Sequence, residues 1–206
     1  MRIVCLSDTH DLHDQLTVPD GDLLIHAGDA TMRGTLPQIA NFDRWLARLP
    51  HRHKVVIAGN HDWLFERDPA LARSLIGHAV YLQDQEATIG GLRIWGSPWQ
   101  PWFYDWAFNL PRGPQLAAKW QLCPASVDVL ITHGPPAGIL DRTEGGDDVG
   151  CEDLLRELLR IRPRLHVFGH IHEGYGTVER DGTRFVNASN CTARYRPLQP
   201  PIVVDL

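Results

Sequence analysis

Short apolar runs recur along the chain, and each ends at a turn of polar or glycine residues. A short uninterrupted apolar run between turn signals is typical of a strand that is buried on both faces. Strands are predicted at residues 3–6, 22–27, 54–57, 80–82, 87–89, 92–95, 127–131, 165–168, 175–179, 183–187 and 202–204. Those at 80–82, 87–89 and 92–95 are short, and those at 175–179 and 183–187 form a hairpin.

Between these strands, apolar residues three and four positions apart predict amphipathic helices. The helices are expected at residues 36–49, 69–76, 115–121 and 151–162. Pro50 and Pro163 end two of them, because the residue before a proline is disfavoured in helical geometry. The alternation of strands with helices predicts an α/β fold.

Residues 96–114 follow neither period and are rich in aromatic residues and proline. A segment of this length predicts a structured loop, and such loops are commonly functional or packed by their own side chains. We expect Trp99, Trp102 and Trp106 to pack this loop onto the domain, with stacking of a nucleobase as the alternative.

Five of the predicted strands end in side chains that can bind a metal ion. Open α/β sheets usually bind ligands at the carboxyl ends of their strands, and five such ends in one chain are hard to explain by packing alone. Asp8 and His10 are two residues apart, so in extended backbone both would point to the same side. The ligand candidates are Asp8, His10, Asp29, Asn60, His133, His170 and His172. His26, which lies inside an apolar run, is predicted to be a core histidine.

The turn at residues 58–62 follows the strand at 54–57 and contains a glycine, an amide, an imidazole and a carboxylate. Gly59 allows a sharp turn. Asn60 offers a neutral oxygen to a hard metal or a phosphoryl group, and His61 offers a proton near neutral pH. We expect Asp62 to orient the His61 imidazole.

Carboxylate, imidazole and amide ligands without a thiolate suit Mn, Fe, Zn or Mg. Seven ligands are too many for one ion, whereas two ions that share a bridging carboxylate would use them all. The four cysteines are widely spaced and are expected to be reduced thiols.

Length and charge narrow the class of protein. A chain of 206 residues predicts one domain, residues 1–206. Its net charge of −5 and the lack of a basic patch argue against binding to long nucleic acid or to a membrane. No secretory or membrane-spanning pattern is found, so a cytoplasmic location is expected.

The motifs Asp8-x-His10, Gly28-Asp29, Gly59-Asn60-His61-Asp62, His133 and Gly169-His170-x-His172 resemble those of the calcineurin-like metallophosphoesterases. The segments 95–99, 108–113 and 173–176 are similar to a subgroup that contains the animal metallophosphoesterase-domain-containing brain proteins and their bacterial relatives. The resemblance implies a four-layer α/β/β/α sandwich. It also implies one metal on Asp8, His10, Asp29 and His172, and a second on Asp29, Asn60, His133 and His170, with Mn²⁺ as the preferred ion.

This resemblance leads to a functional hypothesis. We expect hydrolysis of small nucleotide-like phosphodiesters, cyclic ones included, by attack of a hydroxide held between the metals. His61 would stabilise or protonate the leaving group, Asn60 and His61 would contact the substrate, and Arg112 and His13 are further candidates for that contact. A nucleotide or metal binder with weak catalysis, a phosphomonoesterase and a protein phosphatase are the alternatives. The oligomeric state is left open.

Overall fold

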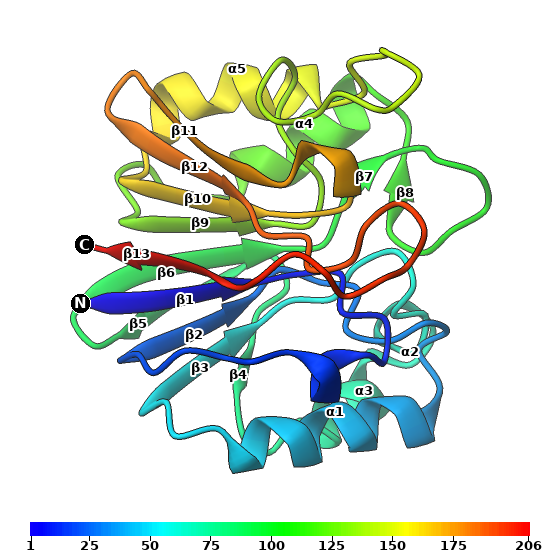
Figure 1. Ribbon diagram of the computed structural model, residues 1–206. Helices are drawn as coiled ribbons and strands as arrows, with labels where there is room; N and C mark the ends of the chain where they lie inside the picture. Colours follow the sequence, from blue (N-terminus) through cyan, green and yellow to red (C-terminus); the bar gives the residue numbers. More distant parts are fainter.

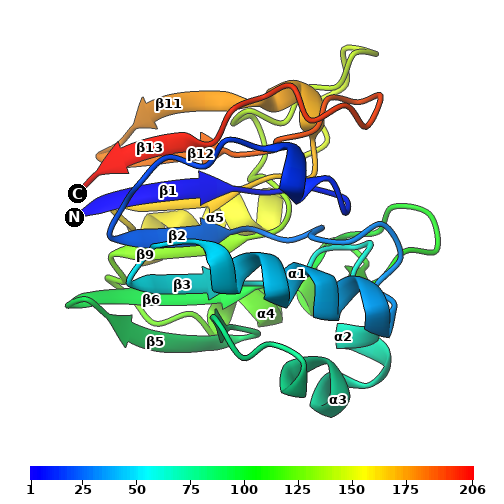
Figure 2. The same cartoon turned by 60° about the horizontal axis from the view of Figure 1, so that its bottom comes forward.

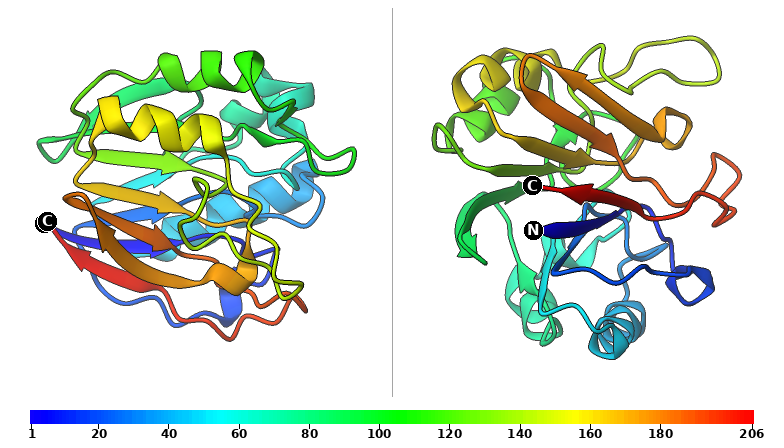
Figure 3. Two further views of the ribbon diagram at one scale, coloured as in Figure 1. Left: turned by 90° about the horizontal axis from the view of Figure 1, so that it is seen from above. Right: turned by 60° about the vertical axis from the view of Figure 1, so that its left-hand side comes forward.

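Two β-sheets packed face to face form the centre of the protein in the computed structural model, which describes residues 1–206 (Figure 1). Helices cover the outer face of each sheet, so the layers run helix, sheet, sheet, helix (Figure 3). The predicted four-layer α/β/β/α sandwich is therefore confirmed.

The first sheet has five strands in the order β13-β1-β2-β3-β4. Strands β1 to β4 run parallel, and β13 pairs antiparallel with β1 at one edge. The strands are β1 (Arg2–Leu6), β2 (Leu23–His26), β3 (His53–Val56), β4 (Val80–Tyr81) and β13 (Ile202–Asp205).

The second sheet has six strands in the order β11-β12-β10-β9-β6-β5. Its four inner strands are parallel, and both edge strands are antiparallel to their neighbours. The strands are β5 (Gln85–Ile89), β6 (Leu92–Ser97), β9 (Val129–Thr132), β10 (Leu165–Phe168), β11 (Gly176–Arg180) and β12 (Thr183–Asn187).

Helix α1 lies along the outer face of the first sheet, with two shorter helices beside it (Figure 2). Helices α4 and α5 cover the second sheet (Figure 1). The α-helices are α1 (Leu36–Arg48), α2 (Leu64–Arg67), α3 (Pro69–Ser74), α4 (Pro114–Gln121) and α5 (Glu152–Ile161), and two 3-10 turns are η1 (His13–Gln15) and η2 (His172–Gly174).

Three apolar cores separate the four layers, and β1 shows how they form. Ile3 and Cys5 point into the core between the two sheets, whereas Val4 and Leu6 point into the core under α1. A third core lies between the second sheet and helices α4 and α5. Because successive strand residues point to opposite faces, a strand between two cores must be apolar at every position, which explains the uninterrupted runs in the sequence.

The structure contains several short elements that were not predicted, the two 3-10 turns among them. Helix α2 was not predicted, because four residues are too few to show a helical period. The segment predicted as a loop at 96–114 contains a small parallel pair of strands, β7 (Gln100–Pro101) and β8 (Asn109–Leu110). His26 is fully buried beside Thr9, which confirms it as a core histidine.

All the parallel strands of both sheets end at the same side of the molecule, on the right in Figure 1. The two sheets are joined there, because Ser7 after β1 forms a bridge with Ser189 after β12. The backbone N–H of Asn190 donates to Ser7 O, and the amide Oδ1 of Asn190 accepts from Ser7 N. Loops from both sheets therefore meet at one edge.

Candidate metal centre

The predicted ligand residues meet at this edge, in loops that follow β1, β2, β3, β9 and β10. Three overlapping groups of side chains have ligand atoms within 4.8 Å of one another. The groups are Asp8, His10 and His172, then His10, Asp29 and His61, then Asp8, Asp29 and His133. Because Asp8, His10 and Asp29 are shared between groups, the three form one continuous cluster.

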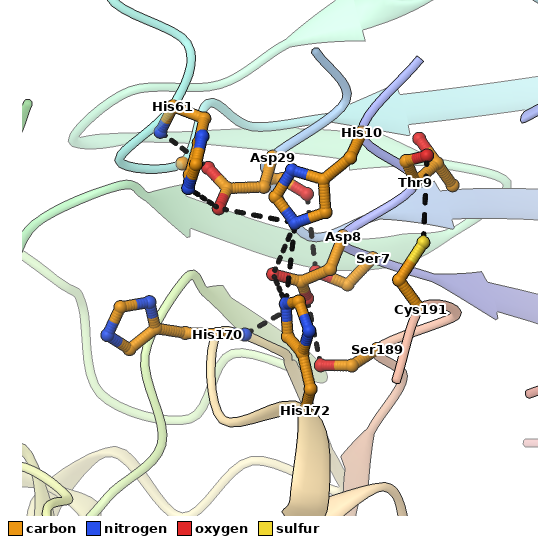
Figure 4. Close-up of polar contacts among 12 residues, drawn as sticks. Ser7, Asp8, Thr9, His10, Asp29, His61, His170, His172, Ser189 and Cys191 are labelled. Atoms are coloured by element: carbon orange, nitrogen blue, oxygen red, sulfur yellow. Dashed lines mark hydrogen bonds and ion pairs between the residues drawn. The ribbon is translucent and has the colours of Figure 1, made fainter. Parts of the chain in front are cut away.

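One half of the cluster joins β1 to the turn after β10 (Figure 4). His10 Nε2 lies 3.3 Å from His172 Nε2, and His172 Nε2 lies 3.4 Å from Asp8 Oδ1. Asp8 Oδ1 is buried and has no hydrogen-bond partner. A buried carboxylate oxygen without a partner is costly, so its position between imidazole nitrogens fits a cation ligand.

The other half of the cluster surrounds His133. Its Nε2 lies 2.8 Å from Asn60 Oδ1 and 3.4 Å from Asp29 Oδ2. The same Asp29 oxygen lies 3.9 Å from His10 Nε2 and 4.0 Å from His61 Nε2. Asp29 Oδ2 thus lies between the two halves, which is the position that a bridging carboxylate requires.

His170 lies beside this cluster and belongs to none of its three groups. Its ring centroid is 5.0 Å from that of His133, and its backbone N–H donates to Asp8 Oδ2. Figure 4 shows its ring directed away from Asp8 and His172. The structure therefore places His170 next to the His133 half and directs its ring away from Asp8 and His172.

Three of the histidines are oriented by backbone carbonyls. The Nδ1 atoms of His61, His133 and His172 lie 2.9 to 3.0 Å from the carbonyl oxygens of Met32, Ala27 and Thr192, respectively. A carbonyl fixes the proton on Nδ1 and leaves the lone pair on Nε2. In His133 and His172 the free Nε2 faces the cluster, as metal-binding histidines require.

The carboxylates are oriented by N–H and O–H donors. Asp29 Oδ1 accepts from the backbone N–H of His61, at 2.7 Å. Asp8 Oδ2 accepts from Ser189 Oγ at 2.9 Å and from His170 N at 3.0 Å. Each carboxylate uses one oxygen for this support and directs the other oxygen into the cluster.

Asp8 and His10 do not use the extended backbone that we expected. Their φ angles are +53° and +44°, and Asp29 and His170 also have positive φ, at +53° and +67°. Non-glycine residues seldom adopt this region, and such strain is concentrated at functional sites. The loops therefore turn sharply at the strand ends, and this turn brings the side chains together.

The expectation that Asp62 orients the His61 imidazole is wrong. Asp62 accepts from the backbone N–H groups of Gly59 and Thr31 and from Thr31 Oγ1. It holds the turn after β3 against the loop after β2, while the Met32 carbonyl orients the imidazole. The sequence could not indicate Met32, because any residue can supply a backbone carbonyl.

Glycines allow the loops to approach the carboxylates closely. A Cβ at Gly59 would collide with the Asp29 carboxylate, and a Cβ at Gly169 would collide with that of Asp8. These positions need glycine for space, since neither has a positive φ.

The electrostatics of the cluster favour cations. Burial would lower the pKa values of His133 and His172, but Asp29 and Asp8 outweigh it and raise both to about 9. Burial would raise the pKa values of Asp8 and Asp29, but the imidazoles hold both well below the usual range. Burial lowers the pKa of His10 to about 4. A cation that binds at neutral pH therefore meets ionised carboxylates and displaces protons from His133 and His172.

Arg112 and His13 lie outside the cluster. Arg112 donates to the backbone oxygens of Val149 and Gly150 and pairs with Glu152. The buried His13 ring packs against Phe42 and Trp45, and its Nε2 lies 3.2 Å from Asn41 Nδ2. These contacts favour structural roles for both residues.

Two aromatic residues contact the cluster. The Trp106 ring lies against His61, with centroids 4.1 Å apart. The Tyr195 ring lies edge-on to His10 at 4.8 Å and to His172 at 5.6 Å. Tyr195 was missed because it lies in a segment without a strand end or a motif. Trp99, in contrast, packs inward on Phe108 as predicted, whereas Trp102, expected to pack in the same way, is strongly exposed.

Comparison with known proteins decides the family. A family model described as calcineurin-like phosphoesterase matches residues 1–174. The chain belongs to this family. The matched range includes every residue of the cluster, from Asp8 to His172, so the resemblance inferred from the motifs is confirmed.

Several relatives are similar over the whole chain. Metallophosphoesterase domain-containing protein 1 of Homo sapiens is 49% identical, and the alignment covers all of this chain and 71% of that protein. A UPF0046 protein of Caenorhabditis elegans is 38% identical, with 60% of its length covered. The crystal structure of TT1561 of Thermus thermophilus has a TM-score of 0.58 at 16% identity and covers 90% of this chain and 88% of its own. That last likeness concerns the fold alone.

Calcineurin-like phosphoesterases typically depend on two metal ions, and this chain has the residues for them. The unpartnered Asp8 Oδ1, the carbonyl-oriented histidines and the position of Asp29 between two groups all fit such a centre. None of the helices is long and apolar enough to cross a membrane.

Proposed function

We propose that the protein is a metal-dependent phosphodiesterase that acts on small nucleotide-like phosphodiesters, with cyclic ones among them. The observation that carries the proposal is the position of Asp29, whose Oδ2 lies within 4.0 Å of imidazole nitrogens from both halves of the cluster. A carboxylate between two sets of ligands is the arrangement that a pair of ions needs, and paired ions favour displacement at phosphorus.

The residues are assigned to two ions. Asp8, His10, Asp29 and His172 would hold the first, and Asp29, Asn60, His133 and His170 would hold the second. His170 lies beside the second set, with its ring centroid 5.0 Å from that of His133, and its ring is directed away from Asp8 and His172 of the first set. Bound ions would supply Lewis acidity and lower the pKa of water towards about 7, with Mn²⁺ preferred and Fe, Zn or Mg as alternatives.

His61 supplies the proton for the leaving group in this proposal. Its ring is buried, its Nδ1 is held by the Met32 carbonyl, and its Nε2 faces the Asp29 side of the cluster. Because Nδ1–H is committed to Met32, the transferred proton is carried on Nε2. Asp29 also anchors this residue, since its Oδ1 accepts from the His61 backbone N–H.

Asn60 positions the substrate beside His61. Its Oδ1 lies next to His133, which leaves the amide NH₂ to donate to a phosphoryl oxygen. The partner would be a small phosphoester rather than a long nucleic acid or a membrane, in agreement with the net charge of −5.

A pair of chromogenic substrates tests the proposal. We expect the Mn²⁺-loaded protein to hydrolyse bis(p-nitrophenyl) phosphate with a higher kcat/KM than p-nitrophenyl phosphate. Asp29→Asn should lose this activity together with at least one equivalent of metal, measured by elemental analysis. Preference for the monoester would assign the protein to the phosphomonoesterases, and no turnover of either ester would leave it as a binding protein.

A further inference from the structure

The exposed aromatic side chains of the protein lie in two loops only. Among its Phe, Trp and Tyr residues, only Trp102, Phe103, Tyr104 and Tyr195 are strongly exposed, with exposed fractions of 61%, 48%, 73% and 42%. Three come from the loop between β7 and β8, and the fourth comes from the segment before β13. Both loops lie at the edge that carries the metal centre (Figure 1).

Tyr195 is held over the centre by its own turn. Its backbone N–H donates to Thr192 O, and Thr192 O also accepts from His172 Nδ1. The turn is thus tied to a predicted metal ligand. Tyr195 has a φ of +53°, a strained value for a bulky residue, and its ring faces His10, His61 and His172. Strain of this kind is maintained where function requires a side chain in one place.

The β7–β8 loop also borders the centre. The Phe103 ring lies at 89° to His170, with centroids 5.5 Å apart, and Trp106 lies on His61. The Asn109 side chain holds the loop in place by three hydrogen bonds. Its Oδ1 accepts from the backbone N–H of Phe103, and its Nδ2 donates to the carbonyl oxygens of Phe103 and Tyr104. Ala107 N donates to Asn60 O, which ties the loop to the substrate-positioning turn.

Packing of the loop does not explain the exposed rings. Trp99 does pack inward, where its Nε1 donates to Asp84 and its ring lies under Lys119. Phe103 and Tyr195 keep nearly half of their surface exposed to solvent even though each ring lies next to a histidine of the centre. Apolar rings beside a polar, metal-binding cluster are the pattern of a site that holds the apolar part of a charged ligand.

We infer that Phe103, Trp106 and Tyr195 form aromatic walls that bind a flat aromatic group attached to the phosphate, such as a nucleobase or an aryl group. This inference rests on the proposed function, because the phosphate must lie on the metal centre for the group to reach these rings. Stacking on such rings tolerates different bases, since every base has a π face.

Calorimetry with three phosphate monoesters tests the walls without turnover of a diester. We expect the Mn²⁺-loaded protein to bind AMP about tenfold more tightly than ribose 5-phosphate, which has the same sugar phosphate and no base. Phenyl phosphate is the third ligand, and it separates recognition of any aromatic ring from recognition of a nucleoside. Tyr195→Leu and Trp106→Leu should each reduce the preference for AMP over ribose 5-phosphate several-fold.

Two further variants serve as controls. Tyr195→Phe keeps the ring and should keep the preference. Trp102 lies in the β7–β8 loop, and its exposed side chain contacts none of the histidines of the centre. Trp102→Leu should therefore leave the preference for AMP unchanged. Equal affinity for AMP and ribose 5-phosphate, or a preference unaffected by Tyr195→Leu and Trp106→Leu, would overturn the inference. Neither result would affect the proposed function, which fails separately if no diester is hydrolysed.

Discussion

The environment of single residues decides what each histidine of the cluster can do. His133 and His172 each use Nδ1 for a backbone carbonyl and present Nε2 to the Asp29 and Asp8 carboxylates. His61 has the same support from Met32, but its Nε2 is 4.0 Å from Asp29 Oδ2. The longer distance and the contact with Trp106 distinguish His61 from these two histidines, and the proposed function assigns its Nε2 to the substrate.

Replacement of His61 tests this distinction. We expect His61→Ala to lower kcat on bis(p-nitrophenyl) phosphate by about 10²- to 10⁴-fold, because a general acid is lost. The same variant should keep two equivalents of metal by elemental analysis, since no proposed ligand changes. Loss of metal would make His61 a ligand, and an unchanged kcat would remove it from the reaction.

At the scale of elements, a hydrogen bond between a buried histidine and a threonine supports a ligand loop in each sheet. His26 on β2 lies 3.1 Å from Thr9 Oγ1, and His166 on β10 lies 2.9 Å from Thr132 Oγ1. Each threonine directly precedes a predicted ligand, His10 or His133. In each pair the histidine lies on a strand next to the one that leads to the threonine: β2 lies beside β1, which precedes Thr9, and β10 lies beside β9, which ends at Thr132. Neighbouring parallel strands thus fix the direction in which the ligand loops leave the sheets.

His166 also makes stability depend on pH. Burial lowers its pKa from 6.5 to about 3, so the unfolded chain binds one more proton between these values. Stability therefore rises with pH through this range and is lost on acidification, by about 1.4 kcal/mol per pH unit for one proton. His166→Gln should reduce the loss of unfolding free energy between pH 5.5 and 4.5 by about that amount, measured by urea unfolding.

A matched variant isolates this effect. His53→Gln replaces a histidine that is partly open to water at the start of β3, and it should keep the wild-type difference between the two pH values. If His166→Gln and the wild type lose stability equally on acidification, His166 is not the group that titrates.

At the scale of the whole molecule, the metal centre joins the two sheets. Asp8, His10, Asp29 and Asn60 follow strands of the first sheet, whereas His133, His170 and His172 follow strands of the second. The unfolded chain cannot bring these residues together, so a cation held by them would bind only the folded state and would stabilise the packing of sheet against sheet.

Removal of metal should therefore lower the melting temperature. At a Mn²⁺ concentration about 100 times Kd, one bound ion stabilises the fold by about 2.7 kcal/mol. For a chain of this length that corresponds to about 5–10 °C, so EDTA should lower Tm by this amount in differential scanning fluorimetry. Asp29→Asn, which disrupts the bridging position, should show a smaller shift. An equal Tm with and without EDTA would contradict the proposed cross-sheet centre.

The sequence by itself determined most of the elements and the residue types of the site, and the family resemblance implied the four layers. Apolar runs identified most of the strands because strands between two cores are apolar at every position, and the ligand residues stood out because they follow such runs. These signals are local, so they can be read from neighbouring residues. The family motifs, which extend from Asp8 to His172, identified the same ligand residues.

Only the tertiary structure decided how the ligands meet and what surrounds them. The left-handed turns at Asp8 and His10, the Met32 carbonyl on His61 and the place of Tyr195 depend on contacts between segments that are distant in the sequence. Such contacts have no period and can be made by many residue types. The order of strands within each sheet and the packing of one sheet on the other therefore determine them, since together they set which loops face each other.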